Sequence, residues 1–555
     1  MTTVESGRSL GLLGRICRAC VYGVLVYWGL YALVTPVTNV DSQIYNVARL
    51  ALAQRGGFFG NPYWTSPLHV MIPWTFDAVH LPFLQLGFGF GLPSFLCLVG
   101  TLVAVFRMMR DRFGPDAAWL TVAGLLALPC LVYQATSTKT DIPLVFCSAV
   151  WAYGFWRWRR ERTWPHLFWM VLAIGFMVGA KTTGLVFGPL LALATLLSLR
   201  RNRLHLMRVT AGLAAAVLLF GGVENYVESA RLYRNPLGPP WIVNDLRNQH
   251  GLRGLAANFS RYVAGGVYLG QSEWEPSRAA ITRLADAERW AFARLGWLDA
   301  GSNFRSPDAD LFFHQSGLEE FSGFGPLGTA AMVLMLAACV RWRPRDWSWR
   351  LAIAALGCVL LISLTVVYSM WNNRYLLVPY SLLVIGCVCF LWEGEGRWRH
   401  LLRWCLAVVA VPAAVAAPLL SFNRTPASLV AAVCDRTTFE TINVPIDGRV
   451  RARLHELRAA TPQCRIVIGV YHDSVVLPYL TDRTLAANVV ANAAMPALLQ
   501  SGKLAAGDLV VLEFEVALPQ LAPVETVTAP NLFGLSRGRT LAPIQRFIYR
   551  YRTGG

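Results

Sequence analysis

The sequence predicts an α-helical polytopic membrane protein with about eleven transmembrane helices and a small C-terminal α/β domain. Of the 555 residues, 55% are hydrophobic and only 15% are charged, whereas soluble proteins carry about 25% charged residues. The charges are absent from long apolar runs, and the last part of the chain changes to a mixed polar composition. These observations exclude a disordered protein and a purely soluble enzyme.

Long apolar runs mark the expected spans, because a helix needs roughly 20 apolar residues to cross a bilayer. We expect spans near 19–37, 83–106, 117–135, 142–157, 164–180, 183–199, 206–223, 324–340, 350–369, 375–392 and 401–420. The first span follows Arg8, Arg15 and Arg18 without a clear small-residue cleavage site. We therefore interpret it as an uncleaved helix rather than a signal peptide.

The distribution of arginine predicts the orientation. The net charge is +18, and Lys139, Lys181 and Lys503 are the only lysines in the sequence. If the spans alternate, the arginine-rich connections all fall on one side, at 1–18, 107–116, 157–163, 200–205, 341–350 and 393–400. The positive-inside rule makes that side cytoplasmic, which places the C-terminal tail outside a membrane that is most simply a bacterial inner membrane. Nucleic-acid binding would instead need a basic face on a soluble domain.

Two large loops and the tail lie on the predicted outer side. Residues 38–82 are rich in Pro, Gly, Trp and Tyr, and residues 224–323 include a stretch at 278–295 with helical spacing. Residues 1–420 then form the transmembrane module, and residues 421–555 form the extracytoplasmic α/β domain. In that tail, HELRAA is typical of a helix end, and RIVIGVYH and DLVVLEFEVAL are typical of strands. Cys434 and Cys464 form a disulfide or remain two free thiols, and the sequence does not decide between these alternatives.

Ionisable residues gather at the outer ends of the spans. Asp41 follows the first span, Lys139 and Asp141 lie in STKTDIP, Lys181 lies in GAKTTG, and Arg374 lies in WNNRY. A transporter more often places charges at the membrane midplane beside broken helices. Charges at the boundary suit an enzyme whose substrate has a lipid tail and a polar head. A carboxylate there can deprotonate a hydroxyl or hold a metal, and Lys and Arg can neutralise a phosphate.

The two outer lysines strengthen this hypothesis. A single interfacial charge usually just anchors a helix end. However, this chain uses arginine almost exclusively, and Lys139 and Lys181 both fall at predicted outer turns. Lysine is a compact point charge that suits a phosphate. The pattern therefore indicates a lipid phosphate as the ligand.

Several short motifs resemble, in the same order, those of the GT-C superfamily of glycosyltransferases, which use polyprenyl-phosphate sugars. The similarity is closest to the branch of protein mannosyltransferases and lipid A aminoarabinose transferases, and it covers about residues 19–390. The motifs are Asp41-Ser-Gln-Ile-Tyr45 with the later NPYWTSPLH segment, Lys139-Thr-Asp141-Ile-Pro143, Gly179-Ala-Lys181-Thr-Thr-Gly184, Glu224-Asn225-Tyr226 with Arg234-Asn235-Pro236, and Arg374-Tyr375-Leu-Leu-Val-Pro379.

The resemblance implies a GT-C-like fold and a hexosyl- or pentosyltransferase that acts with inversion, polyprenyl phosphate being the leaving group. It implies that Asp41 is the catalytic carboxylate and Asp141 a supporting one, and that Lys181 and Arg374 bind the donor phosphate. The position of Lys139 makes it a third candidate for binding this phosphate. Further residues expected to contact substrate are Tyr45, His69, Glu224, Asn225, Asn235 and Tyr375. The acceptor is a lipid-linked glycan, a lipopolysaccharide or a protein, and a divalent metal cofactor stays open. The tail is expected to contact the acceptor or to stabilise the large loop.

Three alternatives differ in what they predict. An oligosaccharide ligase or polymerase with a diphosphate-linked donor favours paired arginines in one large loop, and the loop at 224–323 does contain several arginines. A lipid or sugar transporter requires polar residues at mid-span depth, where the spans have few. A structural membrane subunit predicts that the outer charged residues do not come together.

Overall fold

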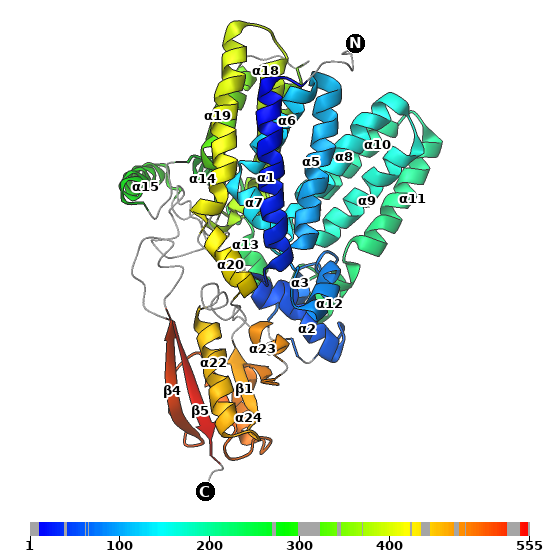
Figure 1. Ribbon diagram of the computed structural model, residues 1–555. Coiled ribbons are helices and arrows are strands. Elements are labelled where there is room, and N and C mark those ends of the chain that lie inside the picture. Colours follow the sequence, from blue (N-terminus) through cyan, green and yellow to red (C-terminus); the bar gives the residue numbers. More distant parts are fainter. Residues whose placement is uncertain are drawn as a thin grey trace.

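The protein is described by a computed structural model. The structure describes residues 10–37, 41–61, 63–64, 66–268, 274–297, 322–340, 346–368, 370–421, 424–434, 445–470, 477–482, 484–529 and 544–552. A bundle of long helices fills most of the molecule, and a small domain with a β-sheet lies at one end (Figure 1).

Each of the eleven predicted segments contains a bundle helix, but in the segment predicted at 83–106 residues 87–91 are not helical. The bundle helices are α1 (Leu12–Val34), α5 (Leu92–Phe113), α6 (Pro115–Leu126), α7 (Pro129–Ala135), α8 (Asp141–Glu161), α9 (Trp164–Ala180), α10 (Gly184–Leu199), α11 (Arg203–Phe220), α16 (Gly325–Val340), α17 (Trp347–Thr365), α18 (Leu377–Trp392) and α19 (Arg397–Leu420). The segment predicted as one span at 117–135 is divided between α6 and α7, which are bent by 76° relative to each other. Pro129 begins α7, and proline disfavours a helical conformation at the residue before it.

Six of the described helices are long and apolar enough to cross a membrane, or seven if α6 and α7 form one broken span. Helices α9, α10 and α16 are apolar but shorter. The predicted class of integral membrane protein is confirmed, whereas the predicted count of eleven spans is not. Helices of 16 or 17 residues are at the lower limit of the length that spans the hydrocarbon core.

Several of the arginine-rich connections lie together at the end of the bundle that holds the N-terminus (Figure 1). The backbone N–H of Gly11 donates to the Asp116 carboxylate at 3.0 Å, and the Arg112 guanidinium lies 4.9 Å from the Trp347 ring centroid. Glu393 in turn accepts a hydrogen bond from the N–H of Ser348 at 3.2 Å. The helices therefore alternate as expected here, and the compartment that this end faces stays a prediction.

The first loop and the large loop are also helical. The first loop contains the π-helix η1 (Ser42–Asn46), α2 (Val47–Gly56), α3 (Leu68–Met71), the 3-10 helix η2 (Asp77–His80) and α4 (Leu81–Leu86). The large loop contains α12 (Val223–Tyr233), α13 (Pro240–Leu246), α14 (Gly251–Gly265) and α15 (Glu275–Leu295). Helix α15 agrees with the helical spacing noted at 278–295.

The C-terminal domain has a five-stranded mixed sheet. After α20 (Pro426–Cys434), its elements are α22 (Pro445–Ala460), β1 (Ile466–Val470), α23 (Leu477–Thr481), β2 (Asn488–Ala491), η6 (Asn492–Ala494), α24 (Met495–Gln500), β3 (Leu509–Leu512), β4 (Leu521–Ala529) and β5 (Ile544–Tyr551). The strand order is β2-β1-β3-β5-β4. Strand β1 is parallel to β2 and β3, and β5 is antiparallel to β3 and β4.

This domain confirms the predicted α/β character of the tail. Both predicted strands exist, but the second ends at Leu512, before the rest of its apolar run. Cys434 is exposed and Cys464 is buried, and both are free thiols.

Candidate functional site

Five charged side chains come together where the bundle meets the first loop. We call them the charged cluster: Asp41, Lys139, Asp141, Lys181 and Arg374. They come from four separate segments. Asp41 directly precedes η1, Lys139 and Asp141 lie where α8 begins, Lys181 joins α9 to α10, and Arg374 lies in the 3-10 helix η5 (Met370–Leu376). The structural-subunit alternative predicts that these charges stay apart. Their convergence therefore favours the enzyme hypothesis over that alternative.

The cluster is a continuous set of ion pairs. The Asp41 carboxylate pairs with the Arg374 guanidinium, and its Oδ2 lies 3.2 Å from Lys139 Nζ. Lys181 Nζ lies 2.5 Å from Asp141 Oδ1. Arg374 Nε lies 4.0 Å from Asp141 Oδ2. Arg374 therefore connects the two carboxylates.

Two tyrosines complete this centre. The Tyr45 hydroxyl is hydrogen-bonded to the Asp41 carboxylate. The Tyr375 ring centroid lies 4.7 Å from Lys181 Nζ and 5.9 Å from Arg374 Cζ. A cation within about 6 Å of an aromatic ring is attracted by its quadrupole. Of the additional residues expected to contact substrate, Tyr45 and Tyr375 thus lie beside the charged cluster.

Charge and burial distinguish the two carboxylates. Three cations face two carboxylates, which leaves one positive charge in excess. The Asp141 side chain is 3% exposed, whereas Asp41 is 20% exposed and is the carboxylate that a ligand can reach. Burial alone would raise the pKa of Asp41, but Lys139 and Arg374 outweigh it and hold that pKa well below its ordinary value.

The connection that carries Lys181 requires glycine at both of its ends. A Cβ atom on Gly179 would lie 1.8 Å from the carbonyl oxygen of Phe220, and one on Gly184 would lie 2.0 Å from that of Met177. Any larger residue would push these backbones apart. The connection is therefore tight, and Lys181 is buried in it. Burial lowers the pKa of Lys181 to about 8, although Asp141 opposes this effect.

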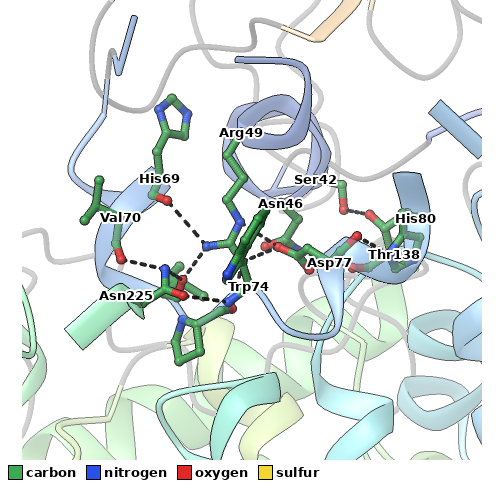
Figure 2. Close-up of polar contacts among 12 residues, drawn as sticks. Ser42, Asn46, Arg49, His69, Val70, Trp74, Asp77, His80, Thr138 and Asn225 are labelled. Carbon is green, nitrogen blue, oxygen red and sulfur yellow. Dashed lines mark hydrogen bonds and ion pairs between the residues drawn. The ribbon is translucent and has the colours of Figure 1, made fainter. Parts of the chain in front are cut away.

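Glu224 and Asn225 hold the first loop instead of joining the cluster. The Asn225 amide nitrogen donates to the carbonyls of Val70 and Ile72, each at 2.9 Å. Its amide oxygen accepts from the N–H of Trp74 at 3.2 Å, as Figure 2 shows. The indole N–H of Trp74 donates to the Glu224 carboxylate.

His69 and Asn235 also make local contacts. His69 is fully buried, and its Nε2 lies 2.9 Å from the carbonyl oxygen of Ile44. The Asn235 side chain accepts a hydrogen bond from the N–H of Leu237 at 3.0 Å, in the turn after α12. Neither side chain has a contact with the charged cluster among the interactions of the described residues.

Sequence analysis missed a buried ion pair inside the first loop. Arg49 Nε donates to Asp77 Oδ2 at 2.9 Å, and Arg49 Nη2 donates to the carbonyl of Pro73 at 2.7 Å. Both side chains are 1% exposed, and Figure 2 shows the guanidinium at the centre of the loop. No sequence motif marks this pair, whose members are 28 residues apart.

We expect Arg49→Met to destabilise the protein by about 3–5 kcal/mol, because it leaves Asp77 buried without its partner. The measurement is the thermal unfolding midpoint in detergent. The double variant Arg49→Met/Asp77→Leu should recover part of the loss, since it removes both charges. Equal midpoints for Arg49→Met and the wild type would contradict the role of this pair.

Acidification should also weaken the first loop. Burial lowers the pKa of His69 and of His80 from 6.5 to about 4. Between these values the unfolded chain binds more protons at these two histidines than the folded chain does, so their contribution to stability falls as the pH drops from 6.5 towards 4. We expect the unfolding midpoint of His80→Gln to fall less steeply over this range than that of the wild type. Identical slopes would refute this.

The cluster does not fit a divalent metal ion. Asp41 and Asp141 already face three cations, so a metal ion there would add to an excess of positive charge. Among the described residues, no group of three or more His, Cys, Asp or Glu side chains is placed to hold a metal.

Comparison with known proteins addresses the resemblance directly. Residues 66–223 match the family described as dolichyl-phosphate-mannose-protein mannosyltransferase. The match confirms the resemblance to GT-C glycosyltransferases. The matched segment carries three of the five cluster residues: Lys139, Asp141 and Lys181.

Two crystal structures of ArnT from Cupriavidus metallidurans are similar to this chain. The form bound to undecaprenyl phosphate has a TM-score of 0.48 at 14% sequence identity, covering 97% of this chain and 98% of that chain. The apo form has a TM-score of 0.41 at 12% identity, covering 96% and 97%. No curated protein matches the sequence.

Proposed function

We propose that the protein is an integral membrane glycosyltransferase that moves a monosaccharide from a polyprenyl-phosphate donor to an acceptor at the end of the bundle carrying the charged cluster. The observation that carries this proposal is the convergence of Asp41, Lys139, Asp141, Lys181 and Arg374 from four separate segments. Buried charges of both signs on loops and helix ends are typical of catalytic centres. The family match over residues 66–223 supports the same activity.

The charge of the cluster favours a monophosphate-linked donor. A sugar joined to a polyprenyl phosphate is a phosphodiester with one negative charge, which balances the one positive charge in excess. A diphosphate-linked donor carries about twice that charge and would leave the centre negative. Unbalanced charge is costly in a poorly solvated site. A ligase or polymerase with a diphosphate donor is therefore the second candidate.

The side chains then take distinct roles. Asp41, the more exposed carboxylate, accepts the proton of the acceptor hydroxyl as that oxygen attacks the anomeric carbon. The bond between that carbon and the phosphate oxygen breaks on the opposite face, so the configuration inverts. Lys181, Lys139 and Arg374 stabilise the charge that develops on the departing polyprenyl phosphate. Asp141 holds Lys181 in place.

The geometry also suggests that the donor binds first. With no phosphate present, Lys139 and Arg374 engage Asp41, and a carboxylate held in this way is a weak base. A donor phosphate competes for the same two cations and thereby raises the pKa of Asp41. The base therefore becomes effective only once the donor is bound.

The setting that we propose is a bacterial inner membrane, with the N-terminus in the cytoplasm and the C-terminal domain outside. The acceptor is then a lipid-linked glycan, a lipopolysaccharide or a protein of the cell envelope. Mass spectrometry of envelope glycans and glycoproteins, with and without the gene, tests the function. We expect one glycan species to lose a single monosaccharide when the gene is absent. Identical spectra would overturn the proposal.

A further inference from the structure

The segment that follows Asp41 lies between the helical bundle and the C-terminal domain (Figure 1). On the bundle side, Asn46 Nδ2 donates to the carbonyl of Thr138 at 3.4 Å, and the Ser42 and Thr138 hydroxyls are hydrogen-bonded to each other. Figure 2 shows these contacts at one end of the loop network. Thr138 directly precedes Lys139, so η1 is joined to the segment that supplies a cation to Asp41.

On the other side, α2 enters the hydrophobic core of the C-terminal domain. One face of this helix is buried with side chains from α22, β1 and α23 in a single continuous cluster. The contributing residues of α2 are Val47, Ala48, Ala51 and Leu52, and those of α23 are Leu477, Tyr479 and Leu480. Helix α23 also contacts η1. The Arg55 guanidinium donates to the carbonyl of Leu480 at 3.2 Å, near the end of α23.

The element between these two supports is a π-helix. Such helices are rare, are short, and occur frequently at functional sites. Their hydrogen-bond geometry gives little stability of its own, so packing must hold them. Thr138 supports η1 from the bundle, and α23 supports it from the C-terminal domain. The position of Asp41, which directly precedes η1, therefore depends on both supports.

We infer that the C-terminal domain is a positioning element of the active centre. Through α2 and η1, helix α23 sets where the Asp41 carboxylate lies relative to Lys139 and Arg374. This inference rests on the proposed catalytic role of Asp41. It gives the tail a function that does not require the tail to touch the acceptor or the large loop.

The role predicts a specific kinetic signature. Lys181 and Arg374 lie on other segments, so a displaced α2 leaves most of the phosphate-binding charge in place. A small shift of a reacting group lowers turnover strongly, by up to about 100-fold for a displacement of 1 Å. Loss of the α23 contact should therefore lower kcat and leave the donor KM nearly unchanged.

The test compares two leucines of the same domain. Leu480 lies in the core that contains α2, whereas Leu499 lies in the core that contains Met495 and Val510, without α2. Both side chains are buried, and both truncations to alanine leave a cavity. We expect Leu480→Ala to lower kcat by at least about 10-fold at an unchanged donor KM, and Leu499→Ala to keep near-normal kcat. Equal kcat values for the two variants would overturn the inference, and so would a change in donor KM alone.

If Leu480→Ala does not fold, a second pair of variants tests the same positioning role. Arg55→Met removes the hydrogen bond to the Leu480 carbonyl and leaves both cores intact, and Arg55→Lys retains a donor. We expect the methionine variant to lower kcat and the lysine variant to restore part of it. Normal kcat in Arg55→Met would also count against the inference. Each assay includes the wild-type full chain in vesicles with a polyprenyl-phosphate sugar as donor and, as acceptor, the envelope glycan that the mass-spectrometry comparison identifies. An inactive wild type refutes the proposed function, whereas an active wild type with unaffected variants refutes only the positioning role.

Discussion

Asp41→Asn lowers the rate of sugar transfer by about 100- to 10,000-fold, which is the usual contribution of a general base, and donor binding survives. The amide keeps the size of the side chain but cannot take a proton from the acceptor. It also removes one negative charge, so the excess of positive charge in the cluster rises. We therefore expect the donor to bind as tightly as in the wild type or more tightly. Single-turnover rates at saturating donor, together with a direct donor-binding titration, measure both effects.

The matched control for this variant is Asp116→Asn. Asp116 lies at the other end of the bundle, where it accepts a hydrogen bond from the N–H of Gly11 at 3.0 Å. This variant should transfer sugar at close to the wild-type rate. Normal turnover by Asp41→Asn would refute the catalytic assignment, and loss of donor binding in that variant would show that Asp41 instead maintains the structure of the site.

The part of the site that sequence could predict depends on helix ends. Asp41, Asp141, Lys181 and Arg374 all flank apolar runs, and alternation of the spans places these flanks on one side of the membrane. Alternation of the spans therefore predicts that these side chains lie on the same side of the membrane, but it does not predict the distances between them. The ion pairs between segments as far apart as Asp41 and Arg374 depend on how the helices pack, which no local pattern encodes.

The residues whose surroundings could not be predicted lie in the first loop. Asn225 and Glu224 belong to a motif that resembles one of the GT-C family, yet their side chains form hydrogen bonds with residues 70–74 of the first loop. Arg49 and Asp77 carry no motif, and only the folded loop brings them together. Polar groups in a buried loop must be satisfied by whatever lies nearby in space, so their partners cannot be read from spacing.

The C-terminal strands show the same limit. The strand β1 is a short run of buried aliphatic residues, and such runs are recognisable. Strands β4 and β5 pair with each other over a bulge between Pro523 and Glu525, and they carry charged residues among apolar ones. Because such strands gain their stability from pairing, their sequences alone did not reveal them.

Arg374→Ala raises the donor KM by roughly 10- to 100-fold, because a hydrogen bond to a charged group contributes about 1.5–3 kcal/mol. Arg374 pairs with Asp41 and lies 4.0 Å from Asp141, so its loss removes the excess positive charge and a link between the two carboxylates. Arg374→Lys should restore only part of the affinity, since lysine keeps the charge and loses the planar fork. Steady-state kinetics with varied donor and fixed acceptor measure the effect.

Comparing the donor KM of Arg231→Ala with that of Arg374→Ala decides between a diphosphate-linked and a monophosphate-linked donor. Arg231 is 56% exposed in the large loop and pairs with Glu228. A ligase that binds a diphosphate through the arginines of that loop needs this residue, whereas a monophosphate site at the charged cluster does not. We expect Arg231→Ala to keep the wild-type donor KM while Arg374→Ala loses affinity. The opposite pattern would move the donor phosphate from the cluster to the large loop and would contradict the role proposed for the charged cluster.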